Sequence, residues 1–394
     1  AGQIVAGAPA SLTPVQQKYY EIYKELVEIN TTHSVGDNTV AARAMARHLA
    51  DAGFAGSEME IVEPFPKKGN LVVRWKGSGE RGPLLLLAHI DVVEAKPEDW
   101  KTDPFKLQET DGYFTARGAY DDKAMASALV SVLAQLRTEG WKPNRDVILA
   151  LTADEERGDV ESNGVLWMTR HRPELLKAEV GINEGGGGEL RGGKPVLHRL
   201  QVAEKMYTSY TAEVRDAGGH SSLPTATNPI YALAAGLERL GQYRFPVKLA
   251  EVTQTYFSRT ASLVGGQVGD DMKAAATGTP DPAAIDRLST TPFYNAMLRT
   301  TCVATMVTAG HAENALPQSA RATINCRILP HDDPAEVDRQ LTAVLGDKVT
   351  LSQILPPTRS PASSLDNEVV RAAEALTAQM WPDVPVIASM SAGA

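Results

Sequence analysis

The sequence predicts an α/β protein, in which a mixed sheet flanked by helices carries a smaller inserted α+β domain. Three observations lead to this prediction. Apolar runs alternate with amphipathic segments up to about residue 200, strands of alternating polarity follow, and a final helix and strand come after about residue 357. We therefore assign residues 1–199 and 358–394 to the first domain and residues 200–357 to the insertion. A chain of 394 residues is long enough for two domains.

Predicted helices and strands alternate along the first part of the chain. Thr13 and Pro14 favour the start of an amphipathic helix that runs to about Asn30. Two further helices fit residues 38–52 and 122–136. Short apolar runs predict strands at residues 71–75, 83–90, 113–117, 147–152 and 180–183. Strands that alternate with helices in this way are typical of an α/β sheet domain.

The predicted insertion begins with strands of alternating polarity such as KMYTSYTAEVR. Residues 244–300 hold several Pro, Gly and Thr and show poor periodicity, so we interpret them as a long irregular insertion. After a linker, a helix at 366–380 and a strand at 384–387 return to the first domain. The other predicted elements are a helix at residues 229–240, a strand pair around 300–329, a helix at 334–345 and a strand at 349–355.

Composition and charge exclude several classes of function. The formal net charge is -9, whereas a protein that binds nucleic acid needs a basic surface. No apolar run approaches the roughly 20 residues that span a bilayer, so we expect no membrane helix. The chain opens with AGQIVAGAPASLTP, without Met, which resembles the mature end left after removal of a signal peptide. We therefore expect a periplasmic or secreted protein, with a cytoplasmic one as the alternative.

The two cysteines of the sequence, Cys302 and Cys326, lie in the predicted strand pair of the insertion. Neither belongs to a CxxC motif, which argues against zinc ligation by thiolates. If the two strands form a hairpin centred near Asn314, the cysteines face each other. A cross-strand disulfide and two buried free thiols are then the two possibilities.

Four short segments of the first domain carry acidic or histidine residues directly after predicted strands. Strands of an α/β sheet bring such side chains to the carboxyl edge, where these folds bind ligands. Imidazole and carboxylate groups gathered there are typical of a two-metal site. The segments are LLLLAHIDVV (His89, Asp91), ARGAYDDKAM (Asp121, Asp122), ALTADEERGD (Glu155, Glu156) and GINEGGGG (Glu184).

Each segment also has a structural interpretation when it is taken alone. A strand-end histidine is often structural, and adjacent acids commonly lie in a solvated turn. In the metal interpretation, His89 binds the ion while Asp91 accepts a hydrogen bond from its other ring nitrogen. Asp121 bridges two cations, and Asp122 caps the following helix. The glycines after Glu184 could instead form a phosphate-binding loop, but no Lys-Ser or Lys-Thr pair follows them.

The order and spacing of the four segments resemble one family. HxD is followed about 30 residues later by GxxDDK, then by DEE, and then by an acid before glycine at similar intervals. This pattern is similar to that of the co-catalytic zinc amidohydrolases, which include aminoacylase, acetylornithine deacetylase, succinyl-diaminopimelate desuccinylase and glutamate carboxypeptidase. The resemblance covers essentially the whole chain. It implies a zinc-peptidase catalytic domain with an inserted, ferredoxin-like domain that serves as lid and dimerisation surface.

The resemblance implies a role for each acidic residue. Asp121 would bridge two zinc ions, and His89 and Glu184 would hold one of them. Glu156, together with a histidine near the carboxyl terminus, would hold the other. Glu155 would be the general base. Cobalt or manganese could replace zinc, because carboxylate-rich sites accept several divalent ions. The family also tends to have a cis peptide bond after the bridging Asp.

The insertion resembles the family as well. AGGHSSLP matches the segment whose histidine, here His220, would reach the partner subunit's active site and stabilise the oxyanion. AENALPQSARATINCRIL matches the substrate-binding hairpin, in which Asn314 and Arg327 would hold the substrate carboxylate. The planar guanidinium of arginine suits this task, because it binds carboxylates with two hydrogen bonds. His311 is more typical of a polar loop residue.

The histidine that would complete the second zinc site has no counterpart in the sequence up to Ala394. The family places this ligand after a segment like SMSAGA, with which the printed sequence ends. A fragment, a cleaved chain with its remainder elsewhere, and a form without this ligand are the three explanations. In each of them we expect the second site of this chain alone to be incomplete. The remaining histidines lie in other contexts: His33, His48, His171, His198 and His331.

These features predict a metal-dependent hydrolase that acts as a homodimer. It would cleave an amide or peptide bond next to the free carboxylate of a small peptide or N-acyl amino acid. Aminopeptidase or dipeptidase activity is the alternative within the same class. A catalytically inactive, dimeric metal-site homologue that acts as a binding module is the alternative from another class. Asp91, Asp121, Glu155 and Glu156 argue against it, because a binding module needs no general base.

Overall fold

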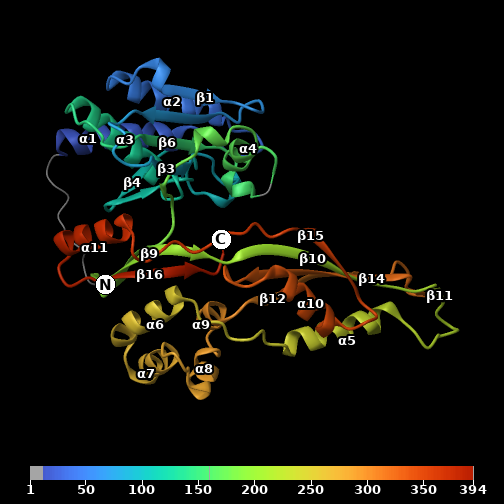
Figure 1. The fold of residues 1–394 in the computed structure, drawn as a ribbon. Coiled ribbons are helices and arrows are strands. Elements are labelled where there is room, and N and C mark those ends of the chain that lie inside the picture. Colours follow the sequence, from blue (N-terminus) through green and yellow to red (C-terminus); the bar gives the residue numbers. More distant parts are fainter. Residues whose placement is uncertain (1–11, 159, 394) are drawn as a thin grey trace. The chain divides into compact units, whose positions relative to one another are not determined.

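The computed structural model describes residues 12–158 and 160–393 (Figure 1). Within them the chain forms two compact units, the first ending at Glu184 and the second beginning at Gly185. Each unit has its own sheets and its own apolar cores. The segment AGQIVAGAPAS, on which the prediction of a processed amino end rests, lies outside the described residues.

A five-stranded mixed sheet forms the centre of the first unit. Its order is β1-β2-β6-β3-β7, and β3 pairs in parallel with both β6 and β7. Every residue of β6 is buried, as expected for the central strand. The carboxyl ends of β3, β6 and β7 therefore meet at one edge of the sheet. The strands are β1 Met59–Val62, β2 Asn70–Trp75, β3 Leu84–His89, β6 Val147–Thr152 and β7 Val180–Ile182.

Helices cover both faces of this sheet (Figure 1). Successive residues of β2 point to opposite faces: Leu71 and Val73 join the core beneath α1, α2 and α3, whereas Val72 packs with Met168 of α4. The three-layer arrangement confirms the predicted α/β fold class. The helices are α1 Pro14–Glu28, α2 Asn38–Asp51, α3 Lys123–Thr138 and α4 Gly164–His171.

The predicted strand at residues 113–117 is only partly correct. β5, Tyr113–Thr115, pairs with β4, Gln108–Thr110, in a separate two-stranded ribbon and does not join the central sheet. Its aromatic residues are exposed, Tyr113 by 74%, so they do not contribute to the core of the sheet. Asp121 consequently lies in the turn before α3 and not at the end of a sheet strand.

The second unit contains a four-stranded antiparallel sheet of order β12-β14-β10-β15. Two helices, α5 and α10, pack on one face of it around Tyr210 and Ile324. In chain order these six elements run β-α-β-β-α-β, which is the ferredoxin-like arrangement and confirms that prediction. The elements are β10 Met206–Arg215, α5 Pro229–Gln242, β12 Thr301–Ala309, β14 Ser319–Ile328, α10 Pro334–Leu345 and β15 Thr350–Leu355.

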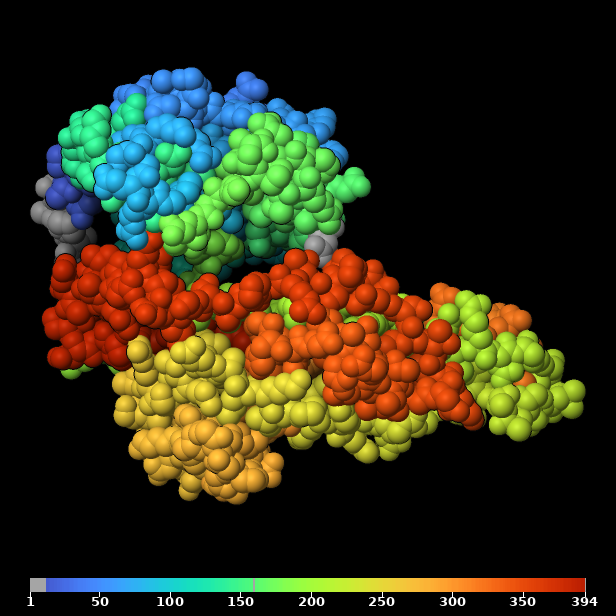
Figure 2. Space-filling model, in the orientation of Figure 1, coloured from blue at the N-terminus to red at the C-terminus, as the bar shows by residue number. Residues whose placement is uncertain are grey.

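Residues 244–300 are mostly helical, from Glu251 to Leu298, so their interpretation as an irregular insertion was wrong. The prolines that suggested loops, Pro282 and Pro292, each occupy the first position of a helix, where their missing N–H is not needed. Figure 2 shows these helices as one continuous yellow-to-orange surface. They are α6 Glu251–Val264, α7 Gly266–Ala275, α8 Pro282–Leu288 and α9 Pro292–Leu298.

A three-stranded sheet joins both ends of the second unit. β16, Val386–Ser391, pairs in parallel with β9, Lys194–Glu204, which pairs with β8, Gly187–Arg191. α11, Glu368–Met380, precedes β16 and contributes Val370 to the core that this sheet shares with α6–α9. The returning segment thus pairs with the strand that leads into the ferredoxin-like sheet. The predicted domain limits at residues 199 and 358 stay predictions.

The two cysteines form the cross-strand disulfide that the sequence left open. Cys302 of β12 lies directly opposite Cys326 of β14, and the two Cα atoms are 4.1 Å apart. None of the described helices is long and apolar enough to cross a membrane.

Candidate metal centre

Three neighbouring strand ends and one turn bring acidic and histidine side chains to the same edge of the central sheet. His89 is the last residue of β3, and Glu184 follows β7 after one intervening residue. Glu155 and Glu156 lie in a short 3-10 turn, Glu155–Arg157, that follows β6. Asp121 comes from the turn before α3. This local arrangement follows from the parallel pairing of β3 with β6 and β7.

The His89 imidazole lies at the centre of this group. Its Nε2 atom is 2.9 Å from Asp121 Oδ1, 3.7 Å from Glu184 Oε2 and 3.9 Å from Glu155 Oε2. One ligand atom from each of His89, Asp121 and Glu184 lies within 4.8 Å of the other two. His89 is buried, 3% exposed, whereas the Asp121 side chain is 58% exposed. The group therefore opens toward solvent on the carboxylate side.

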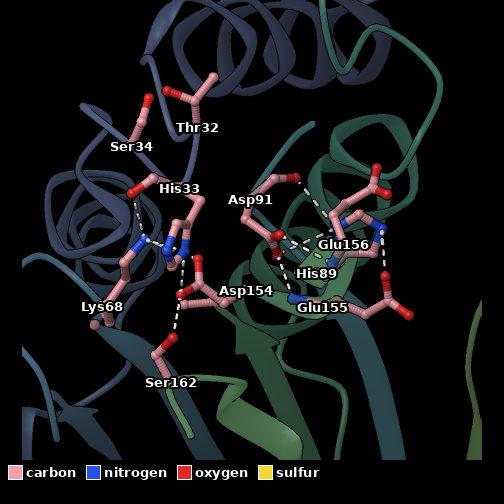
Figure 3. Close-up of polar contacts among 12 residues, drawn as sticks. Thr32, His33, Ser34, Lys68, His89, Asp91, Asp154, Glu155, Glu156 and Ser162 are labelled. Atoms are coloured by element: carbon pink, nitrogen blue, oxygen red, sulfur yellow. Dashed lines mark hydrogen bonds and ion pairs between the residues drawn. The ribbon is translucent and has the colours of Figure 1, made fainter. Parts of the chain in front are cut away.

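Asp91 lies behind His89 and holds two parts of the site. His89 Nδ1 is 3.1 Å from the Asp91 carbonyl oxygen and 3.4 Å from its carboxylate, so the ring nitrogen away from the cluster faces Asp91. The same carboxylate accepts hydrogen bonds from the backbone N–H groups of Glu155 (3.0 Å) and Glu156 (3.1 Å) (Figure 3). The sequence pattern gave no sign of this second task, because it depends on the path of the backbone after β6.

The clustered charges shift the pKa values of the side chains concerned. Burial lowers the pKa of His89, but the neighbouring Asp91 and Glu184 outweigh burial and raise it to about 12. Burial raises the pKa of Glu155 to about 7, against the attraction of His89 and with repulsion from Glu184. Burial and Asp121 also raise the pKa of Glu156. Without a cation, the site therefore retains protons near neutral pH.

Asp122 is buried and does not cap α3 with its side chain, in contrast to the prediction. It occupies the position before the helix, but its Oδ2 accepts a hydrogen bond from the backbone N–H of His89 at 3.3 Å. Burial raises the pKa of Asp122 to about 7. The peptide bond between Asp121 and Asp122 is cis, as the family resemblance implied. The carboxylate that could have capped the helix holds β3 instead.

The residues present fit a divalent cation. One imidazole faces three carboxylates within 4 Å, and this excess of negative charge is costly in a partly buried site unless a cation compensates it. Imidazole nitrogen and carboxylate oxygen are the ligands that zinc and related ions take in catalytic sites. Glu156 lies beside the group but outside the set of His89, Asp121 and Glu184.

The three predicted residues of the second unit fall at two places. His220 ends β11, Gly219–His220, which pairs with β13, Ala315–Leu316. Asn314 directly precedes β13, and its carbonyl oxygen accepts a hydrogen bond from the Ser221 N–H. His220 and Asn314 thus lie side by side, and both are exposed, as is His311.

Arg327 lies toward the other end of β14, roughly 26 Å from the start of that strand at about 3.3 Å per residue. Its guanidinium lies 4.7 Å above the ring of Tyr207, and its Nε donates to Asn325 Oδ1 at 3.4 Å. A Cβ atom on Gly393 would lie 1.9 Å from Arg327 Nη1, so this glycine permits the close approach of the turn after β16. The structure does not bring Asn314 and Arg327 together within one chain.

Comparison with known proteins places these features in context. The sequence model described as peptidase family M20/M25/M40 matches residues 85–394. A probable carboxypeptidase S-like protein of Dictyostelium discoideum is 30% identical over 80% of this chain and 62% of its own length. The N-fatty-acyl-amino acid synthase/hydrolase PM20D1 of Xenopus tropicalis is 31% identical over 68% of this chain and 53% of its own length. The chain thus spans about half to three fifths of the curated relatives that it matches.

Solved structures have the same fold. An M20 family metallo-carboxypeptidase from Sulfolobus solfataricus superposes with a TM-score of 0.67 at 20% identity, covering 96% of this chain and 86% of that one. Human carnosine dipeptidase 1 superposes with a TM-score of 0.59 at 19% identity, covering 96% and 85%. The sequence match confirms the family resemblance that the four motifs predicted, and the structural matches confirm the fold class.

Proposed function

The chain belongs to peptidase family M20/M25/M40, and from this premise we propose that it carries the catalytic site of a metal-dependent hydrolase. The reaction is cleavage of an amide or peptide bond next to a free carboxylate. The observation that carries the proposal is the convergence of His89, Asp121 and Glu184, with Glu155 beside them. This is a ligand set together with a carboxylate that is free to accept a proton.

The proposed metal ligands are those that the sequence pattern predicted. His89 and Glu184 would hold one zinc ion, Glu156 would contribute to a second, and Asp121 would be a ligand shared by both. When bound, the ions would supply Lewis acidity, which favours attack on the scissile carbonyl and lowers the pKa of water. Asp91 fixes the orientation of the His89 ring through Nδ1. Zinc is the proposed ion, and cobalt or manganese are substitutes that the same ligands accept.

Glu155 is the proposed general base. It accepts a proton from the water that attacks the carbonyl carbon and returns this proton to the leaving nitrogen. Two backbone hydrogen bonds to Asp91 hold the turn that carries it, so the carboxylate is positioned before substrate binds. His220 is proposed to stabilise the negative charge that develops on the carbonyl oxygen.

The proposed substrate is a small peptide or an N-acyl amino acid. Relatives named probable carboxypeptidase S-like and N-fatty-acyl-amino acid synthase/hydrolase support this class. Arg327 is proposed to bind the substrate carboxylate, because a guanidinium can bind a carboxylate with two hydrogen bonds and this one is placed over the ring of Tyr207. A panel of N-acyl amino acids and free dipeptides discriminates this proposal from aminopeptidase or dipeptidase activity, which requires preference for a free amino terminus.

We also propose a homodimer that forms through the second unit. β12 has only β14 as a neighbour among the described strands, and its Val303, Met306 and Val307 are each more than half exposed. An exposed edge strand with apolar side chains is suited to association with a second copy. The separation of Asn314 from Arg327 within one chain supports a substrate site that is shared between copies.

The disulfide supports an oxidising location. The bond between Cys302 and Cys326 is of a kind that persists outside the cytosol and is rare within it. We propose that the protein works in the periplasm or is secreted.

The decisive experiment replaces Glu155 with Gln in the zinc-loaded protein. We expect kcat to fall by about 10²–10⁴-fold, because the general base is lost, while the zinc content stays unchanged. Glu156→Gln is the informative comparison, since it should lower the zinc content as well as the rate. Glu161→Gln changes an exposed carboxylate of the same segment and should leave both unchanged. Substantial activity in Glu155→Gln would overturn the assignment of the general base.

A further inference from the structure

A buried carboxylate immediately precedes the proposed general base. Asp154 is completely buried and has a left-handed backbone conformation, with φ of 57°. Figure 3 shows its side chain among His33, Lys68 and Ser162, whereas the next two residues, Glu155 and Glu156, lie beside His89. The backbone conformation at Asp154 thus directs consecutive acidic side chains to different surroundings. Such a conformation is costly for a residue other than glycine, so the contacts of its side chain must hold it.

Three side chains from separate parts of the first unit donate to Asp154. Lys68 Nζ lies 2.8 Å from Oδ1, while His33 Nδ1 and Ser162 Oγ lie 3.0 Å and 2.5 Å from Oδ2. Lys68 is itself buried, with 9% of its side chain exposed, and its ammonium also donates to the His33 carbonyl oxygen at 3.1 Å. The buried carboxylate is therefore paired with a buried cation and hydrogen-bonded at both oxygens.

The loop that carries His33 is also attached to the segment that follows Asp91. Thr32 forms an isolated parallel β-bridge with Val92, the residue after Asp91. Ser34 donates to the Glu94 carboxylate from both its backbone N–H (3.0 Å) and its hydroxyl (2.8 Å). One loop thus contacts the Asp154 carboxylate through His33 and the segment that follows Asp91 through Thr32 and Ser34.

The turn with Glu155 and Glu156 is held from two directions. On one side the Asp91 carboxylate binds its backbone N–H groups. On the other side, the residue before the turn is Asp154, and its side chain is held by His33, Lys68 and Ser162. A buried ion pair is weak support for stability as such, since well-packed apolar residues often serve equally well, but it specifies one geometry. Position is what a general base requires, because displacement by about 1 Å can lower a rate by about 10²-fold.

We propose that His33, Lys68 and Ser162 are positioning residues that act through Asp154 on the general base. His33 links the loop at residues 31–36 to the catalytic turn, Lys68 neutralises the buried charge, and Ser162 completes the hydrogen bonding of Oδ2. The catalytic consequence rests on the proposed function, whereas the structural consequence, a turn that is ordered by these contacts, does not.

The test compares His33→Leu, His33→Asn and His48→Leu. Leucine removes the donor to Asp154, whereas asparagine can replace Nδ1 with an amide N–H. His48 is the matched control, because its Nε2 contacts a carboxylate of the same unit, Glu25, at 2.6 Å and away from the site. Ser162→Ala removes a different donor to the same oxygen of Asp154 and provides a second, independent variant.

Two measurements are made on each variant. The first is hydrogen exchange in the metal-free protein, for peptides that contain the Glu155 and Glu156 amides. The second is kcat and KM of the zinc-loaded protein, together with its zinc content. For His33→Leu we expect about tenfold faster exchange at the turn and a kcat lower by about 10–100-fold, with KM and zinc content within about twofold. Ser162→Ala should also speed exchange at the turn and lower kcat. His33→Asn should restore most of the kcat that His33→Leu loses.

The outcomes distinguish the structural part of the proposal, an ordered turn, from its catalytic part. Unchanged exchange at the turn in both His33→Leu and Ser162→Ala overturns it, as does an equal effect of His48→Leu. A rise in KM with unchanged kcat also overturns it, because this would indicate a contact with substrate. If the wild-type protein hydrolyses no substrate of the panel, the proposed function fails, while the exchange measurement still decides whether the Asp154 contacts order the turn.

Discussion

The two units of the chain place their predicted functional residues in different ways. In the first unit, side chains that are far apart in sequence, from His89 to Glu184, converge around one imidazole. In the second unit, His220 and Asn314 lie together near the start of β14, but Arg327 lies roughly 26 Å along that strand. The first set gathers at one place in its unit, and the second set is divided between two places.

This difference follows from how strands pair. Neighbouring parallel strands end at the same edge of a sheet, so residues that follow β3, β6 and β7 must meet. Residues along one strand of an antiparallel hairpin are separated by the length of the strand and can act together only with help from elsewhere. The first unit thus carries the proposed chemistry, whereas the second carries proposed substrate contacts that need a further surface.

The largest expected contrast between the units is their response to metal. Zinc at about 1,000 times its Kd should stabilise the first unit by about 4 kcal/mol, because the ion binds only the folded ligand set. Tryptophan fluorescence during denaturant unfolding reports on this unit, since Trp75, Trp100, Trp141 and Trp167 precede Gly185 and only Trp381 follows it. Hydrogen exchange in β10 and β14 is the control and should not change with zinc. If zinc stabilised both units equally, the expected difference between them would be wrong.

The second expected difference affects the second unit and not the first, and it comes from the disulfide. Reduction, or the double variant Cys302→Ala/Cys326→Ala, should destabilise the second unit by about 3 kcal/mol, because the bond closes a loop between positions 24 residues apart. Hydrogen exchange should accelerate in β12 and β14 and stay unchanged in β3 and β6. The alanine variant must be insensitive to reductant. If reductant loosens the first unit instead, the assignment of this effect to the Cys302–Cys326 bond is wrong.

The length of an element decided whether it could be predicted from the sequence. Long apolar or amphipathic stretches gave β3, β6, α1 and α3 close to their observed bounds, because their periodicity is set by burial on one or both faces. The helices between residues 251 and 298 were missed, since α8 and α9 are each only seven residues long and begin with Pro282 and Pro292. A proline that starts a short helix has the same sequence appearance as a proline in a loop.

The candidate site was predicted as far as strand ends determine it. His89, Asp121, Glu155 and Glu184 gather as expected, although Asp121 comes from a turn. The contacts of Asp154 could not be predicted. Its partner His33 is 121 residues away in the sequence, and no motif surrounds His33. For the same reason Asp122 was assigned as a helix cap. Only the folded backbone shows that its carboxylate meets the His89 N–H.

The smallest expected contrast is in the pH dependence of stability without metal. In the first unit, the folded pKa values of Glu155 and Asp122 are raised to about 7, from 4.5 and 3.8. The folded state then binds more protons than the unfolded state between about pH 4 and pH 7. Stability of this unit should therefore fall as pH rises through that window. The effect is moderated by solvent, because the Glu155 side chain is 44% exposed.

The second unit should show no such slope over the same window. Its shifted carboxyls include Glu213 and Asp271, whose pKa values are lowered by Arg321 and Arg287. A lowered pKa adds stability that is present above the unfolded value and is lost only as pH falls below it, so the change lies at more acidic pH. Metal-free unfolding at pH 5 and pH 7, followed by tryptophan fluorescence and by exchange in β14, measures both units.

Zinc should reverse the slope in the first unit, because its ligands release their protons when the ion binds. Asp122→Asn should flatten the slope, and an unchanged slope in that variant would mean that the protons are held elsewhere.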